Sequence, residues 1–298
     1  MPTPEPESFR HVADDGFDLA CACIVPEHPN GCVLIVHGAK EHKERYYPFM
    51  RELAAAGWAS VAFDLRGHGA SVGGSYPLGH WNSADALVGD IASLAPTARE
   101  LAGDGPLVLL GHSLGSMLAR MYLREHDDTI DKLVLSGTAA YLAPAPLGVH
   151  LANLICRMKG EKGHSPLLKQ VVESRNVGWV NSDAEELARY KADPLCCGYR
   201  YTCAAVRALV EANAEMKRLD RWKCSNPGLP ILSITGELDR RVALGEKGVE
   251  DACDDLRRIG YRDVRYRIYP GIKHELLVGR QRAQVMPDVL GFLEERVG

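Results

Sequence analysis

The chain has 298 residues, of which 46% are hydrophobic and 25% charged, and its formal net charge is −4. This composition is typical of a globular protein, and the charge excludes a basic field for binding nucleic acid. No apolar run reaches the roughly 18 residues that a membrane-spanning helix needs, and the polar, proline-rich N-terminus lacks the apolar segment of a signal peptide. The length suits one large α/β domain with an insertion, whose core needs no disulfide bonds.

The first part of the chain alternates between strand and helix patterns. An antiparallel hairpin is expected at residues 9–25, and the continuous apolar run at residues 32–36 indicates a buried parallel strand. Further strands are expected at residues 58–63, 107–110 and 132–136, and helices at residues 46–56, 85–102 and 116–124. This alternation predicts a mostly parallel central sheet with helices on both faces.

The alternation stops in the middle of the chain and resumes near the end. Residues 141–226 show no strand pattern but three helical ones, whereas residues 229–235 and 264–269 predict strands and residues 247–259 and 283–295 predict helices. We therefore expect a core formed by residues 1–140 and 227–298, with residues 141–226 as a helical cap inserted at the carboxyl edge of the sheet. Active sites of open α/β sheets lie at that edge.

The pentapeptide GHSLG, residues 111–115, is the most informative motif. It matches G-x-S-x-G and lies between a predicted strand and a predicted helix, which is the context that a nucleophile elbow requires. The turn places Ser113 in a strained backbone conformation with its hydroxyl out of the sheet. Ser113 is therefore the predicted nucleophile.

A serine nucleophile needs a base, and the base needs an acid that fixes its tautomer. In this sheet order both are expected after the serine. Asp239 follows the strand pattern at 229–235, and His274 follows the pattern at 264–269, so both are predicted at the edge that carries Ser113. Glu237 follows the same strand as Asp239 and is the alternative acid, whereas the loop at residues 137–141 carries none.

The developing oxyanion needs two peptide N–H donors. One is expected from Leu114, directly after the nucleophile, and the other from the loop after the strand at 32–36, where we favour Ala39. His112 neighbours Ser113, and a structural role is expected for it. The loop at residues 66–69 lacks the lysine and the spacing of phosphate-binding motifs.

The substrate pocket is expected between this edge and the cap. An apolar stripe at helical spacing, which includes Leu147, Leu151 and Met158, is predicted to line it together with His37. The alternative is that the stripe packs on the core.

The nine cysteines favour reduced thiols in a cytoplasmic protein, and the adjacent Cys196 and Cys197 lack the spacing of a metal or redox motif.

Together these motifs resemble the α/β-hydrolase superfamily, and within it the monoacylglycerol lipase and lysophospholipase group of serine hydrolases. The resemblance runs in order through HGAKEH at 37–42, FDLRGHGAS at 63–71, GHSLG at 111–115, GELD at 236–239 and YPGIKH at 269–274. It implies an α/β-hydrolase fold and cleavage of monoacylglycerols, lysophospholipids or similar small acyl esters, without a metal or another cofactor. Carried over, the catalytic roles fall on Ser113, Asp239 and His274, and the oxyanion donors are Ala39 and Leu114.

One position departs from this family. Lys40 stands where monoacylglycerol lipases often have a second glycine, and the lysine side chain is expected to narrow the pocket mouth or to add a positive charge there.

The expected partners are a small acyl-ester or lipid substrate, and a membrane surface that the cap contacts transiently. A thioesterase, an amidase, a cofactor-free haloperoxidase or a non-catalytic binding protein on the same fold stays open as an alternative.

Overall fold

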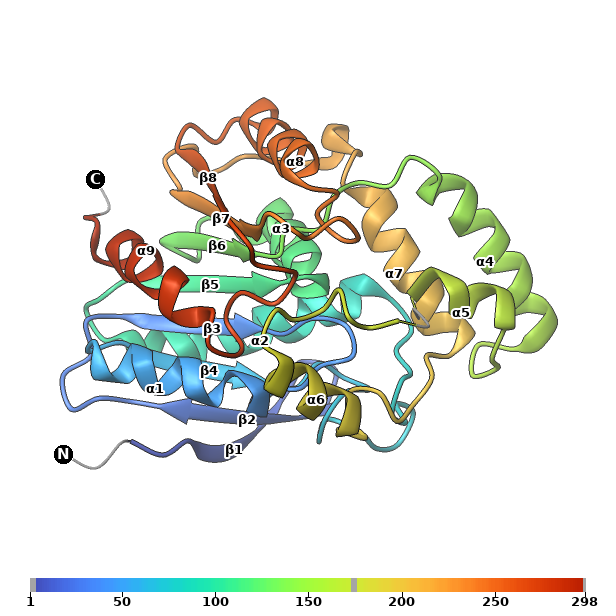
Figure 1. Ribbon diagram of the computed structural model, residues 1–298, viewed down its shortest axis with the longest axis horizontal. Helices are drawn as coiled ribbons and strands as arrows, with labels where there is room; N and C mark the ends of the chain where they lie inside the picture. Colours follow the sequence, from blue (N-terminus) through green and yellow to red (C-terminus); the bar gives the residue numbers. More distant parts are fainter. Residues whose placement is uncertain (1–3, 173–175, 297–298) are drawn as a thin grey trace.

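A computed structural model describes residues 4–172 and 176–296. Within these residues, eight strands form one sheet in the order β1-β2-β4-β3-β5-β6-β7-β8. The strands are β1 Glu7–Val12, β2 Asp18–Ile24, β3 Cys32–Val36, β4 Ala59–Phe63, β5 Leu107–His112, β6 Lys132–Ser136, β7 Ile231–Gly236 and β8 Val264–Tyr269. The pairs β1–β2 and β2–β4 are antiparallel, and all the others are parallel. The predicted α/β-hydrolase fold is confirmed (Figure 1).

Helices cover both faces of the sheet. They are α1 Tyr47–Ala55, α2 Ala84–Ala102, α3 Leu114–His126, α4 Ala145–Lys159, α5 Pro166–Val172, α6 Ala184–Ala192, α7 Cys203–Glu215, α8 Glu246–Ile259 and α9 Arg282–Glu294, with 3-10 turns η1 Lys43–Tyr46 and η2 Leu219–Arg221. Strand β3 shows why both faces need a cover, because its side chains alternate between two cores. Leu34 and Val36 belong to the core that also holds side chains of α2, α3 and α8, whereas Val33 and Ile35 belong to the core that holds side chains of α1 and α9.

Most predicted elements are found, with shifted ends. The helix after the GHSLG motif begins at Leu114, two residues earlier than predicted, and the predicted helix at 201–219 is divided into α7 and η2. Thr202 explains where α7 begins, because its hydroxyl accepts the peptide N–H of Ala205 as an N-terminal cap. None of the helices in the described ranges is both long and apolar enough to cross a membrane.

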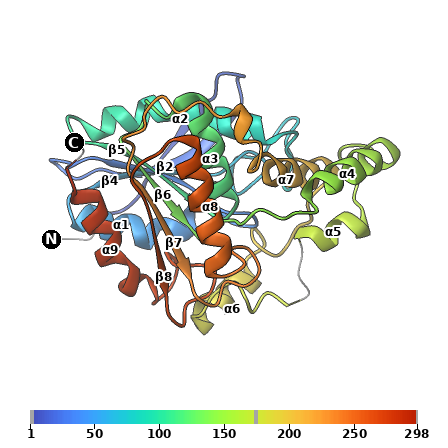
Figure 2. The same cartoon turned by 90° about the horizontal axis from the view of Figure 1, so that it is seen from above.

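The segment between β6 and β7 holds α4, α5, α6, α7 and η2, and none of its described residues forms a strand. Figures 1 and 2 show α4, α5 and α7 grouped at one end of the molecule, away from α1 and α9. Helix α4 packs on α7 through small side chains, and a Cβ atom at Gly148 would lie 3.0 Å from Val210. The boundaries of the cap at residues 141 and 226 stay a prediction.

Candidate active site

Ser113 lies between the end of β5 and the start of α3. Its backbone has φ 54° and ψ −113°, a region that residues with a side chain rarely adopt, so this turn is strained. Its peptide N–H donates to the carbonyl oxygen of Ser136 at 2.9 Å, which ties the turn to the neighbouring strand. A Cβ atom at Gly115 would collide with the carbonyl oxygen of Val36, so glycine lets α3 pass closely over β3. The geometry is that of a nucleophile elbow.

Two loops at the same sheet edge bring Asp239 and His274 together. Nδ1 of His274 and Oδ2 of Asp239 are 2.6 Å apart, and both side chains are buried. The second carboxylate oxygen of Asp239 accepts the peptide N–H of Val242 at 3.0 Å. Because the carboxylate holds a proton on Nδ1, Nε2 is the nitrogen that can accept one. Glu237, the alternative acid, is exposed and accepts the N–H of Gly271 instead.

The electrostatic surroundings suit a base and its acid. Burial alone would lower the pKa of His274, but the charge and hydrogen bond of Asp239 outweigh it and raise that pKa above its ordinary value. Burial opposes ionisation of Asp239 too, yet attraction to His274 and the bond from Val242 bring the pKa of this carboxyl below its ordinary value. Asp239 therefore stays charged next to a histidine of increased basicity.

The loop after β3 has few peptide N–H groups left for an oxyanion. The N–H of Gly38 donates to Glu41 at 2.7 Å, and the N–H of Lys40 donates to the Tyr201 hydroxyl at 2.6 Å. Within the described residues, neither Ala39 nor Leu114 has a protein acceptor for its N–H. Both residues line the cavity that Ser113 lines, so their placement agrees with the predicted donor role.

A buried ion-pair network joins this loop to the residue after His274. The Arg45 guanidinium donates to Oε1 of Glu41 at 2.6 Å and to both carboxylate oxygens of Glu275, one of them at 3.0 Å. Glu275 also accepts from the side-chain amide of Asn181 at 2.7 Å. Sequence reasoning missed this network, and its only local signal is the spacing of four residues between Glu41 and Arg45.

The two carboxyl groups of this network differ in acidity. Burial raises the pKa of Glu41 to about 7, although Arg45 opposes this. Arg45 and Asn181 overcome burial at Glu275 and lower the pKa of that group to about 2. The surroundings therefore oppose ionisation of Glu41 and favour ionisation of Glu275.

The other two histidines near Ser113 have structural partners. Nδ1 of His112 lies 3.2 Å from the Ser136 hydroxyl, and burial, together with the charge of His274, lowers the pKa of His112 to about 3. His37 accepts the N–H of Leu65 at 3.0 Å, and its other ring nitrogen bonds the carbonyl oxygen of Gly38. His37 is not among the residues that line the cavity, contrary to the prediction, because both ring nitrogens hold backbone segments in place.

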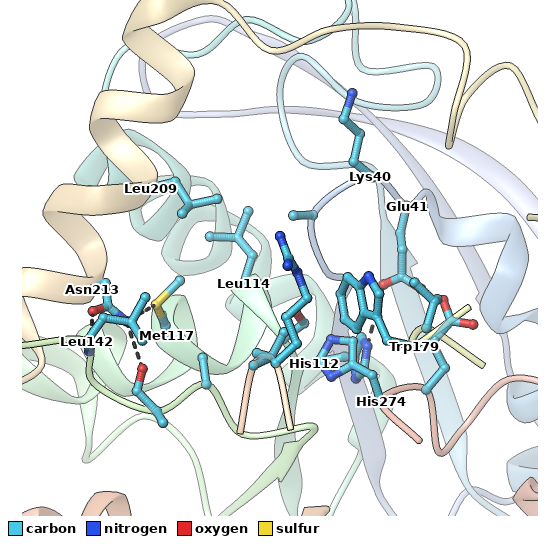
Figure 3. Close-up of a pocket in the computed structure, with 18 of the residues that line it drawn as sticks. Lys40, Glu41, His112, Leu114, Met117, Leu142, Trp179, Leu209, Asn213 and His274 are labelled. Atoms are coloured by element: carbon cyan, nitrogen blue, oxygen red, sulfur yellow. Dashed lines mark hydrogen bonds and ion pairs between the residues drawn. The ribbon is translucent and has the colours of Figure 1, made fainter. Parts of the chain in front are cut away.

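A cavity of about 400 Å³ opens at Ser113 and His274. Figure 3 shows Met117, Leu142 and Leu209 on one side of Leu114, and Trp179 and His274 on the other. The cavity therefore has an apolar arm on one side of Ser113 and a more polar region around the histidine.

The predicted lining by Leu147, Leu151 and Met158 differs from the structure. These side chains lie on the outer face of α4, where Leu147 and Met158 are 73% and 75% exposed. The buried face of α4 carries Ala152, Ile155 and other residues that pack with α7. The helical spacing was correct, but Leu147, Leu151 and Met158 face outward, whereas Ile155 and smaller side chains face inward.

One group of described residues has the composition of a metal site, namely His42, Asp193 and Cys196, whose donor atoms lie within 4.8 Å of one another. An ion pair of 2.8 Å between His42 and Asp193 already occupies two of these donors. Burial raises the pKa of the Cys196 thiol, which disfavours the thiolate that binds metals. None of the nine cysteines forms a disulfide bond in the structure.

Known proteins with the same architecture identify the family. The model of the family described as serine aminopeptidase, S33, matches residues 27–281. The chain is 28% identical over 268 residues to a monoacylglycerol lipase of Mycolicibacterium smegmatis, covering 89% of this chain and 88% of the relative. It is 25% identical over 281 residues to a monoglyceride lipase of Mus musculus, covering 91% and 84%.

Solved structures show the same fold. A thermostable carboxyl esterase from Bacillus coagulans, in complex with glycerol, aligns with a TM-score of 0.84 and 25% identity over 97% of this chain and 98% of that one. A monoglyceride lipase from Saccharomyces cerevisiae, in complex with a substrate analogue, aligns with a TM-score of 0.77 and 19% identity over 98% and 96%. The chain is therefore a serine hydrolase with the α/β-hydrolase fold and belongs to the serine aminopeptidase S33 family.

Proposed function

We propose that this protein is a serine carboxylester hydrolase that cleaves monoacylglycerols or closely related acyl esters, with Ser113, Asp239 and His274 as its triad. The observation that carries the proposal is the 2.6 Å contact between His274 and Asp239 in the wall of the cavity that also exposes the strained Ser113. The relatives named as monoacylglycerol and monoglyceride lipases support the substrate class.

The chemistry follows from these positions. His274 takes the proton of the Ser113 hydroxyl as its oxygen attacks the ester carbonyl, and Asp239 stabilises the resulting imidazolium. The N–H groups of Ala39 and Leu114 stabilise the oxyanion of the tetrahedral intermediate. His274 then protonates the leaving alcohol as the ester C–O bond breaks, which leaves the acyl group on Ser113. Water, deprotonated by His274, releases the carboxylic acid and regenerates the serine.

The shape of the cavity supports an acyl ester as the substrate. Its volume of about 400 Å³ lies in the range of sites for small ligands. The apolar arm formed by Met117, Leu142 and Leu209 suits an acyl chain that starts at Ser113. At the far end of this arm the amide of Asn213 is bonded to backbone groups of Leu142 and Ala140, so it is a fixed boundary for the chain.

The description of the family as aminopeptidases raises peptides as a second substrate class. An aminopeptidase needs an unpaired acidic group to bind the α-ammonium of its substrate. Among the described residues of the cavity wall, the carboxylates are Glu41 and Glu275, and Arg45 binds both of them. The pairing of these carboxylates favours esters over peptides.

Hydrolysis of a series of monoacylglycerols by the wild-type protein and the variant Ser113→Ala tests this proposal. We expect turnover that falls by at least about 10⁴-fold in the variant, with an unchanged melting temperature. Hydrolysis of thioesters with the same acyl group, and of aminoacyl amides, measured in parallel, compares the ester hydrolase with the thioesterase and peptidase alternatives. Full activity of Ser113→Ala, or a preference for the amides, would contradict the proposal.

We also propose that α4 contacts membrane surfaces transiently and that the protein acts in the cytoplasm. The exposed side chains of Leu147, Leu154 and Met158 along α4 support the membrane contact. Sedimentation with phosphatidylcholine vesicles should weaken in Leu147→Ser/Met158→Ser but not in Val12→Ser, which removes an exposed side chain on β1. Equal sedimentation of all these variants and the wild type would contradict the role of α4.

A further inference from the structure

Apart from the histidines, the charged side chains that line the described cavity wall are two carboxylates and two cations. Glu41 and Glu275 both bond the Arg45 guanidinium, so each carboxylate is engaged in an ion pair. The remaining charged groups of the described wall, apart from the histidines, are Lys40 and Arg241, which are both positive. The Lys40 side chain is bound by the protein itself. Its ammonium donates to the carbonyl oxygen of Tyr199 and lies 3.9 Å from the centroid of the Tyr199 ring.

Arg241 is placed differently. It lies two residues after Asp239, it is exposed, and its guanidinium carbon is 5.3 Å from the centroid of the Trp179 ring. Among the described residues, no carboxylate pairs with this guanidinium. The indole Nε1 of Trp179 is a second nitrogen donor here that is buried without an acceptor in the described part of the chain. The region therefore holds an exposed positive charge that has no carboxylate partner among the described residues.

The position of this region relative to His274 tells which part of a substrate it meets. The Trp179 and His274 ring centroids are 5.3 Å apart, and the guanidinium carbon of Arg241 is also 5.3 Å from the Trp179 centroid, so Trp179 neighbours both the histidine and the arginine. In the proposed mechanism His274 protonates the leaving alcohol, so that alcohol lies against His274 and Trp179. The apolar arm that suits the acyl chain lies on the opposite side of Leu114 (Figure 3).

We propose that Arg241 is a specificity-determining residue that binds an anionic group, a phosphate or a carboxylate, on the alcohol portion of the acyl-ester substrate. A guanidinium presents paired N–H donors that match the oxygen atoms of either anion, and the Trp179 face holds its plane in place. This inference rests on the proposed ester hydrolysis and predicts that acyl esters with a negatively charged alcohol portion are preferred over the neutral monoacylglycerol.

Three esters of one short acyl chain, soluble as monomers, test the proposal: the monoacylglycerol, its 3-phosphate and the corresponding acyl ester of glycerate. The measured quantity is the ratio of kcat/KM for each anionic ester to kcat/KM for the neutral one. In Arg241→Gln we expect this ratio to fall by about ten-fold, through KM, because an exposed charge-assisted hydrogen bond is lost. Increasing salt should lower the wild-type ratio, because an exposed ion pair is screened.

Arg240→Gln is the matched control, since it removes the same charge from the neighbouring residue, which is exposed but does not line the cavity. Its ratio should equal that of the wild type. A fall in Arg241→Gln for the phosphate alone, or for both anions, supports the proposal and identifies the anion.

Two outcomes would overturn the inference, and they differ in what they say about the proposed function. If Arg241→Gln keeps the wild-type ratio for both anions while Ser113→Ala loses hydrolysis of the neutral ester, the role of Arg241 is wrong and the ester hydrolase stands. If the wild type hydrolyses none of the three esters, the proposed function fails and the inference fails with it.

Discussion

The groups at the strand ends and helix α4 of the cap are held in place by different forces. At the strand ends, Asp239, His274, Glu41 and Glu275 are buried, the Arg45 side chain is 8% exposed, and each of these groups bonds to at least one other polar group. On the cap side, α4 rests on α7 through a narrow apolar seam, and its largest side chains face solvent. Polar partners therefore fix the reacting groups, whereas α4 is positioned by packing alone and should tolerate change.

The largest effect should come from the acid of the triad. Asp239→Asn removes the charge that fixes the tautomer of His274, and we expect kcat to fall by about 10⁴-fold. The matched control is Glu237→Gln, because Glu237 follows the same strand but is exposed and bonded to Gly271. Steady-state kinetics on a monoacylglycerol measures both. Similar losses in the two variants would show that the strand end, rather than Asp239, matters.

The next effect concerns the network that joins the two strand-end loops. Arg45→Met leaves the carboxylates of Glu41 and Glu275 without their counterion, and we expect the free energy of unfolding to fall by about 3–5 kcal/mol. Arg189→Met on α6 is the control, since this side chain is 72% exposed in its ion pair, and its loss should be below about 1 kcal/mol. Urea denaturation measures both values, and equal losses would refute a special role for Arg45.

The two faces of α4 give a smaller effect. Ile155→Ala empties a site in the seam with α7 and should destabilise the protein by about 2 kcal/mol, whereas Leu151→Ala should stay within about 0.5 kcal/mol. Leu151→Asp should leave the preference for acyl chain length unchanged, because Leu151 does not line the cavity. A changed chain-length profile in Leu151→Asp would restore the lining role that the sequence predicted.

The smallest effect concerns the pH at which kcat/KM falls on the acid side. His274 acts as a base only when neutral, so kcat/KM must fall as the pH drops through its pKa. Because burial is outweighed by Asp239 and the pKa of His274 is raised, the midpoint of this acid limb should lie above about 6.5. Glu41 is a buried carboxyl of raised pKa in the same cavity wall, so the profile of Glu41→Gln separates its contribution from that of His274. A limb that disappears in Glu41→Gln, or a midpoint below 6.5, would contradict this assignment.

The sequence predicted the parts of the site that depend on local patterns. The GHSLG turn needs its glycines and a flanking strand and helix, and Asp239 and His274 directly follow apolar strand runs, so short segments carry these signals. Arg45 and Glu275 are 230 residues apart, and no local pattern relates them. Their pairing is visible only once the sheet brings the two loops together.

The face of α4 was not predictable for a different reason. Helical periodicity identified the helix, but the usual assumption that the largest apolar residues are buried failed there. Ala152 and Cys156 carry a weak apolar signal, yet they are buried with Ile155 on the face of α4 that packs on α7. The location of Arg241 in the cavity wall likewise depends on Trp179, a residue of the distant cap.

The central claim is that Ser113 is the nucleophile and that His274 activates it. Labelling with a fluorophosphonate, followed by mass-spectrometric mapping of the modified peptide, tests this most directly, because the reagent bonds only to an activated serine. We predict a single adduct on Ser113 in the wild type and a strongly slowed reaction in His274→Ala. Modification of another serine, or an unchanged labelling rate in His274→Ala, would contradict the account.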